Sequence, residues 1–326
     1  MKPKTPTTVI LGFAAGAMLL SGCSSAGSSS NSSDLGSGTG TDGVSVVATT
    51  SMLGDVVGQI VGCGGGSVTV LMPIGTDPHD FSASSDQVAG MVNADLVVAN
   101  GLGLEAGLGD SFSNAEADGA NIFEVAPQLD PIELGAGMHA HEGEELDDHG
   151  DLDPHFWFDM NRMATAAQLI GAELTQVTGD ENYTTCADTT ASEITAAETE
   201  VRAILESVPV DQRILVTDHD ALGYLADTYG FEIAGTLIPS GSTLAEASSA
   251  DLAALVETIN AESVPAIFAN VAEPAALAEA VAAETGTNIA IIPLYVGSLG
   301  APDSAAATYI DMMRTDAQLI ADGLKG

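Results

Sequence analysis

The sequence predicts an α/β fold of two lobes, each a parallel β-sheet flanked by helices, with one long rigid helix joining the lobes. Two patterns indicate this fold. Short apolar runs of strand character alternate with longer segments of helical period, which is typical of parallel sheets with crossover helices. Between two such series, residues 182–207 contain no Gly or Pro and carry acidic residues and Ala at helical spacing. The body from about Val44 to Gly326 is long enough for two domains with substantial cores.

The first series of elements defines an N-terminal lobe at 44–180. Its apolar runs predict strands at 44–48, 68–72, 96–100 and 122–125, and its helical periods predict helices at 52–61, 84–92 and 160–177. A connecting helix then occupies 181–209 and ends at Pro209. The C-terminal lobe at 210–326 repeats the alternation. We expect its strands at 214–217, 232–236, 266–269 and 289–292, and its helices at 221–229, 250–260 and 275–284.

Residues 1–22 are predicted to be a signal peptide, because Lys2 and Lys4 precede an apolar run that ends at Leu20. The run is shorter than the roughly 20 residues of a membrane-spanning helix, which favours cleavage over a permanent transmembrane anchor. The small residues before Cys23 resemble the lipobox of bacterial lipoproteins, which implies cleavage before Cys23 and lipidation of its sulfur; alternatively, Cys23 belongs to an ordinary cleaved signal. The Ser- and Gly-rich residues up to 43 predict a flexible tether at 23–43.

Strong negative charge restricts the partners of this chain. Cleavage after residue 22 leaves five basic residues against 46 acidic ones. Such a field repels nucleic acid and anionic lipid and attracts cations, so we expect no nucleic-acid partner and membrane association through the lipid alone. The same composition also serves solubility or salt tolerance, and that explanation stays open.

Two cysteines remain after Cys23. Cys63 and Cys186 are 123 residues apart, and an even pair outside the cytoplasm often forms a disulfide. Such a bond would join the start of the body to a later helix. Two buried free thiols are the alternative.

The chemistry of the chain has to be inferred from six histidines, which are His79, His139, His141, His149, His155 and His219. Three of them, His79, His155 and His219, lie where a predicted strand or loop meets a helix, the edge at which α/β sheets gather ligands. Their spacings of 76 and 64 residues exclude a local zinc-finger or HExxH site, so they meet only through the fold. A lone His beside Asp is more often a hydrogen-bonded residue than a ligand. Asp159 and Asp220 are candidates either to orient imidazoles or to cap helices.

Three segments carry a family resemblance, at 75–79 (GTDPH), 153–157 (DPHFW) and 217–224 (TDHDALGY). They resemble, in the same order, the metal-binding motifs of the zinc- and manganese-specific solute-binding lipoproteins of ABC transporters. The resemblance covers nearly the whole mature chain. It implies a metal-specific periplasmic-binding-protein fold with one metal ion in the cleft between the lobes. His79 and His155 would be the ligands from the first lobe and His219 the ligand from the second.

The resemblance also bears on the choice of metal. Manganese-type relatives tend to have a carboxylate at the position of His219, and imidazole suits zinc, so the set points to Zn²⁺ rather than Mn²⁺. The family's fourth ligand, often an Asp, matches Gly297 in this chain. Asp303 in the same loop is our candidate substitute, and water is the other.

The remaining histidines, His139, His141 and His149, lie in a polar, acidic stretch without regular pattern. Zinc-type relatives have a His-rich loop here that collects metal or accepts it from a zinc metallochaperone; a solvated surface loop is the alternative.

From these features we expect a monomer that captures zinc outside the cytoplasm and delivers it to an ABC permease and its ATPase. The chain would be lipid-anchored to the outer face of the cell membrane, or exported to the periplasm. Reversible capture, rather than catalysis, is expected. The alternatives are a secreted zinc-dependent hydrolase, against which no general base or Gly-x-Ser-x-Gly motif stands out, and a metal-binding surface adhesin.

Overall fold

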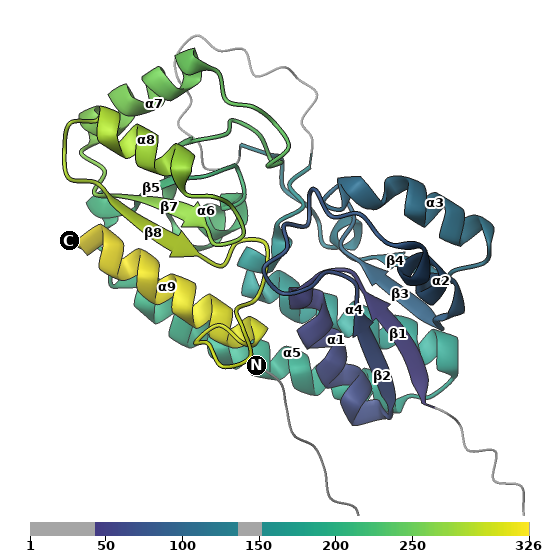
Figure 1. Ribbon diagram of the computed structural model, residues 1–326. Coiled ribbons are helices and arrows are strands. Elements are labelled where there is room, and N and C mark those ends of the chain that lie inside the picture. The colour runs from purple at the N-terminus through teal and green to yellow at the C-terminus, as the bar shows by residue number, and fades with distance from the viewer. Residues whose placement is uncertain (1–42, 136–151, 326) are drawn as a thin grey trace, which may run out of the picture. The chain divides into compact units, whose positions relative to one another are not determined.

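The computed structural model of the chain describes residues 43–135 and 152–325. Within them, strands and helices alternate and form two four-stranded parallel sheets (Figure 1). The predicted fold class is therefore confirmed. None of the helices in these two ranges has both the length and the hydrophobicity needed to span a lipid bilayer. The predicted signal peptide, the tether with Cys23, and His139, His141 and His149 lie outside the described residues.

The first sheet has the strand order β2-β1-β3-β4, with all neighbours parallel. Its strands are β1 (Val44–Ala48), β2 (Gly66–Val70), β3 (Leu96–Ala99) and β4 (Ile122–Glu124). The helices of this part are α1 (Ser51–Gly64), α2 (Ser85–Asn93), α3 (Gly109–Ala117) and α4 (Met160–Thr178). Every residue of β3 is buried, as expected of a parallel strand with both faces covered.

The second sheet has the order β6-β5-β7-β8 and is also parallel. Its strands are β5 (Ile214–Thr217), β6 (Glu232–Thr236), β7 (Ala266–Asn270) and β8 (Ala290–Leu294). The helices are α6 (Gly223–Tyr229), α7 (Ser249–Glu262), α8 (Ala276–Glu284) and α9 (Tyr309–Lys325). Short 3-10 helices lie at Ala106–Leu108, Ala126–Gln128, Phe156–Phe158 and Val210–Gln212.

The long helix α5 (Asn182–Glu206) has 25 residues and lies between the two series of elements. It packs against α4, α1 and α9. Its buried positions recur every three or four residues, for example at Ala187, Ile194 and Val201, which is the period of a helix with one apolar face. Residues of both sheets and of α5 belong to one continuous hydrophobic core. This shared core limits how far the two parts can separate.

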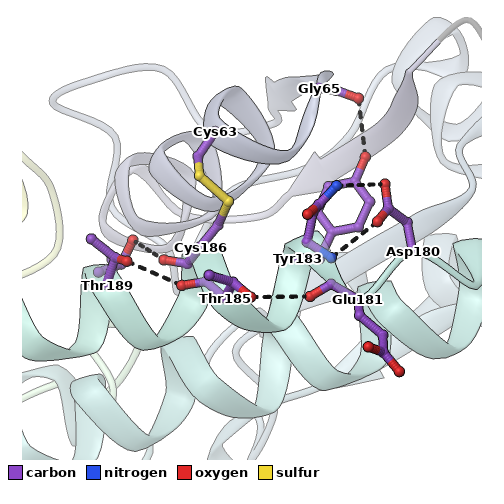
Figure 2. Close-up of a disulfide and its surroundings, with 10 residues drawn as sticks. Cys63, Gly65, Asp180, Glu181, Tyr183, Thr185, Cys186 and Thr189 are labelled. Carbon is purple, nitrogen blue, oxygen red and sulfur yellow. Dashed lines mark hydrogen bonds between the residues drawn. A yellow bond between two sulfur atoms is a disulfide. The ribbon is translucent and has the colours of Figure 1, made fainter.

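A disulfide joins Cys63 at the end of α1 to Cys186 in α5, with 5.9 Å between the Cα atoms (Figure 2). Next to it, the Tyr183 hydroxyl donates a hydrogen bond of 3.0 Å to the Gly65 carbonyl, which follows α1. The first sheet is thereby tied covalently and by hydrogen bonding to the long helix. The exact lobe boundaries at 180 and 209 stay a prediction.

Candidate metal centre

Three separate loops carry His79, His155 and His219 to one place. His79 lies between β2 and α2, His155 directly precedes the 3-10 helix Phe156–Phe158, and His219 follows β5 by two residues. At most 2% of each residue is exposed. One ligand atom from each of the three lies within 4.8 Å of the others. The fold thus brings together three side chains that span 140 positions of the sequence, from His79 to His219, as the strand-to-loop pattern predicted.

The free nitrogens of the three rings fit a metal ion. The Nε2 atoms of His155 and His79 lie 3.3 Å apart, and ring centroids are 5.2 Å to 5.4 Å apart for all three pairs. His219 Nε2 and His79 Nδ1 have no hydrogen-bond partner among the described residues. Buried polar atoms are rarely left without a partner. Neutral imidazole nitrogens at this spacing match the donor set of a tetrahedral zinc site with one further position.

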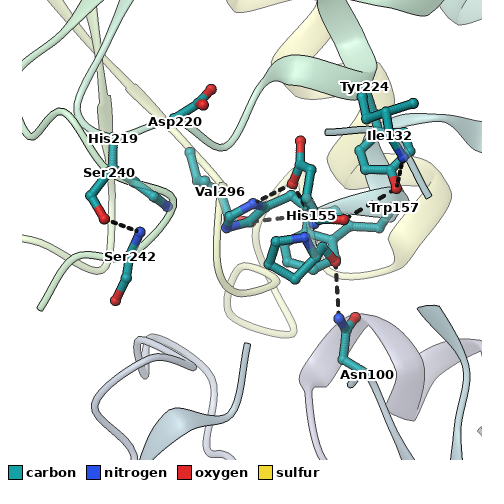
Figure 3. Close-up of polar contacts among 12 residues, drawn as sticks. Asn100, Ile132, His155, Trp157, His219, Asp220, Tyr224, Ser240, Ser242 and Val296 are labelled. Carbon is teal, nitrogen blue, oxygen red and sulfur yellow. Dashed lines mark hydrogen bonds and ion pairs between the residues drawn. The ribbon is translucent and has the colours of Figure 1, made fainter. Parts of the chain in front are cut away.

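Two aspartates orient these rings. Asp153 Oδ1 lies 2.8 Å from His155 Nδ1 and also accepts a hydrogen bond from the His155 backbone N–H (Figure 3). Asp218 Oδ2 lies 3.1 Å from His219 Nδ1. Carboxylates that hold Nδ1 fix the ring and leave Nε2 available as a ligand. The main chain at Asp153 is held in turn, because its carbonyl accepts from the Tyr224 hydroxyl at 3.1 Å.

Asp159 and Asp220, the two aspartates that the sequence offers as candidates to orient the imidazoles, make other contacts. Asp159 caps α4, since its carboxylate accepts from the backbone N–H of Asn161 at 2.9 Å and pairs with Arg162 at 2.6 Å. Asp220 accepts from the Gly135 backbone N–H at 2.7 Å and so links two loops. For Asp159, the capping alternative is correct. The residues that do orient the rings were not predicted from the sequence. Asp218 lies one position before His219, and Asp153 lies two positions before His155.

Burial sets the protonation of the histidines. Desolvation, followed by the neighbouring rings of His155 and His219, lowers the pKa of His79 to about 3. Desolvation also holds the pKa of His155 well below its usual value. For His219, desolvation acts in the same direction, but the charge and hydrogen bond of Asp218 outweigh it and raise the pKa. At neutral pH, His79 and His155 are therefore neutral and able to donate lone pairs, while His219 retains affinity for a proton.

Asp303 does not join the three histidines. It is exposed, in a tight turn where the Gly300 N–H donates to the Ala306 carbonyl and the Ser304 N–H to the Ala301 carbonyl, both at 2.8 Å. The turn folds back on itself and holds Asp303 on the surface, outside the group of ligand atoms found among the described residues. The expectation that Asp303 completes the site is therefore not supported.

Gly297 lies against the turn that carries His79. A Cβ atom at this position would be 2.8 Å from Pro78 Cδ, so a side chain here requires Pro78 to move. The loop is fixed close by, because Trp157 Nε1 donates to the Val296 carbonyl at 3.1 Å (Figure 3). Gly297, where the resemblance implies a carboxylate, is thus packed against the turn of His79 and has no side chain.

His79 lines a cavity of about 530 Å³. Other residues around it come from several loops, and they are Leu102, Gly103, Leu134, Leu152, Pro154 and 240–242. The loop after β6 therefore forms one wall of this cavity.

Comparison with known proteins decides the class of this site. The model of the family described as the periplasmic component A of a zinc-uptake complex matches residues 46–323. The chain belongs to this family. Members of the family are solute-binding components of metal ABC transporters and not enzymes, which excludes the hydrolase alternative. The chain is accordingly an extracytoplasmic metal-binding component of such a transporter.

Individual relatives of the family differ in the metal that they are named for. The manganese-binding lipoprotein MntA of Halalkalibacterium halodurans is 27% identical over 310 residues, which cover 94% of this chain and 95% of the relative. The manganese ABC transporter substrate-binding lipoprotein PsaA of Streptococcus mitis is 25% identical over 286 residues, or 86% and 88% of the two chains. The solved structure of the periplasmic zinc-binding protein TroA of Treponema pallidum aligns with a TM-score of 0.75 at 29% identity and covers 86% of this chain and 99% of that one.

Proposed function

We propose that this family member captures Zn²⁺, rather than Mn²⁺, with His79, His155 and His219. The observation that supports zinc is the chemistry of the group itself. It consists of three buried imidazoles, and no carboxylate oxygen belongs to it among the described residues. Imidazole is a good ligand for zinc, whereas manganese prefers carboxylate and carbonyl oxygen. A water molecule in the remaining position completes a tetrahedral set.

Capture is reversible in this proposal. The neutral rings of His79 and His155 can take the ion directly, whereas the raised pKa of His219 makes protons compete with the ion at that ring. Asp153 and Asp218 hold their rings in the binding orientation throughout. The core shared by both sheets and α5 limits the change on binding to loops or a small hinge motion.

The rest of the transport cycle follows from the family. The chain passes its ion to an ABC permease driven by its ATPase, and we propose that it does so as a monomer held at the membrane by a lipid on Cys23. His139, His141 and His149 would collect metal near the site or accept it from a zinc metallochaperone. Lobes at 44–180 and 210–326, joined by 181–209, are the two binding halves.

Calorimetric titration of the metal-free protein tests the ligand set. We expect one zinc ion per chain and a loss of affinity of about 100-fold in His219→Ala, because one of three protein ligands is removed. Asp303→Ala is the matched control, since this carboxylate is exposed and lies outside the group. An unchanged affinity in His219→Ala, or a large loss in Asp303→Ala, would contradict the assignment.

A further inference from the structure

The loop at 239–248, between β6 and α7, has no regular structure and forms part of the wall of the cavity above His79. The residues before it are held on the end of β5, because the Leu237 N–H donates to Thr217 O at 2.9 Å and the Ile238 N–H to Asp218 O at 2.7 Å. Its own first turn is local, with the Ser242 N–H donating to Ser240 Oγ at 3.2 Å (Figure 3). Beyond this turn the loop reaches across to the part of the chain that carries His79.

One carboxylate joins this loop to the turn of His79. The Thr243 hydroxyl donates a hydrogen bond to Asp77 Oδ2. The other oxygen, Asp77 Oδ1, accepts from the His79 backbone N–H at 3.0 Å. Asp77 is 6% exposed, so both hydrogen bonds are largely shielded from water. A hydrogen bond to a shielded carboxylate is among the stronger ones in proteins. A displacement of the loop therefore acts directly on the turn that carries a ligand.

We infer that Thr243 is a positioning residue that latches the 239–248 loop over the metal cavity through Asp77 and slows the release of the ion. The latch contains no metal ligand, so it acts on the rate of escape rather than on coordination. The effect of the latch on zinc release rests on the proposed function, whereas its effect on the mobility of the loop does not. Loss of one hydrogen bond to a carboxylate is expected to speed release by about tenfold.

The variant Thr243→Val removes the hydroxyl and keeps the shape of the side chain. Thr258→Val is its matched control, because Thr258 is also half-buried and donates only to Ala254 O of its own helix, at 3.1 Å. Thr243→Ser restores the donor. Each zinc-loaded protein is mixed with excess EDTA, and the rate of zinc loss is followed.

Hydrogen exchange of the metal-free proteins provides a readout that needs no metal. The amides of Ser242 and Leu244 are hydrogen-bonded within the loop, so opening of the loop exposes them. We expect faster exchange at 239–248 in Thr243→Val, and wild-type exchange in Thr258→Val and Thr243→Ser. The order of zinc release rates should be the same.

Two results would overturn the latch. One is equal exchange at 239–248 in Thr243→Val and Thr258→Val, and the other is faster exchange without faster zinc release. Failure of the wild type to bind zinc would instead refute the proposed function, and the exchange data would still decide whether Thr243 holds the loop.

Discussion

Reduction of the disulfide should lower the stability of the protein strongly and leave its metal site intact. Cys63 and Cys186 close a loop of 123 residues between α1 and α5. In the chain-entropy treatment, a cross-link over a loop of this length restricts the unfolded chain by about 5 kcal/mol at 25 °C. For a body of this size, that free energy corresponds to a decrease in Tm of roughly 10 to 20 °C. None of the three histidines belongs to α1 or α5, so the zinc stoichiometry of the folded protein should not change.

Calorimetric melting of the oxidised and the reduced protein measures this effect. The double variant Cys63→Ala/Cys186→Ala should melt near the reduced wild type, and its Tm should not respond to added reductant. Cys63 is exposed but Cys186 is only 4% exposed, so the reduced wild type, which keeps both sulfur atoms, measures the loss of the bond alone. Equal Tm values for oxidised and reduced wild type would refute the reasoning, because they would show that the cross-link does not restrict the unfolded chain.

Three further perturbations test the electrostatics of the site and the core. Zinc affinity should fall as the pH drops through the raised pKa of His219, by up to about tenfold per pH unit, because a protonated ring cannot bind the ion. A zinc affinity that stays constant between about pH 5 and pH 8 would contradict this. Asp153→Asn should weaken zinc binding by about 10- to 100-fold through loss of ring orientation, with wild-type affinity as the refuting result. Burial raises the pKa of Asp316 to about 7, so the folded state holds this proton more tightly than the unfolded chain does. The free energy of unfolding should therefore fall by up to about 4 kcal/mol as the pH rises from about 4 to about 7. Asp316→Asn should flatten this slope in urea unfolding, and an unchanged slope would assign the pH dependence to other groups.

Much of the fold was accessible from local sequence patterns. The strands β1, β5 and β6 begin and end where the apolar runs do, and α5 matches its Gly- and Pro-free segment. β2 was placed two residues too late, at 68–72, because Leu71 and Met72 are buried and apolar but follow the strand. An apolar sequence indicates that a segment is buried, but the bounds of β2 are set by its hydrogen-bonded pairing with β1, which ends at Val70.

Two helices were not predicted, for opposite reasons. In α3, Ala115 is the one buried residue, so the segment has no apolar period to detect. In α9, by contrast, buried residues recur with helical spacing from Tyr309 through Met313 and Ile320 to Leu324, so this segment does carry the sequence signal of an amphipathic helix.

The sequence predicts which histidines lie near the ends of strands, but not the directions in which side chains of the loops point. The sequence pattern places His79, His155 and His219 where strands or loops meet helices, and the family resemblance is what makes them candidate ligands. The direction of a side chain within its loop is not encoded locally, so Asp303 was nominated and lies exposed, while Asp153 and Asp218 were passed over. The contact between Thr243 and Asp77 joins residues 166 positions apart and has no sequence signal at all.

Competition between metals tests the account most directly. The metal-free protein is mixed with equimolar excess zinc and manganese, separated from unbound ions, and analysed for bound metal. A site of three imidazoles predicts one zinc ion per chain and essentially no manganese, and His219→Glu should raise the share of manganese. Retention of manganese in preference to zinc by the wild type would contradict the proposed zinc specificity.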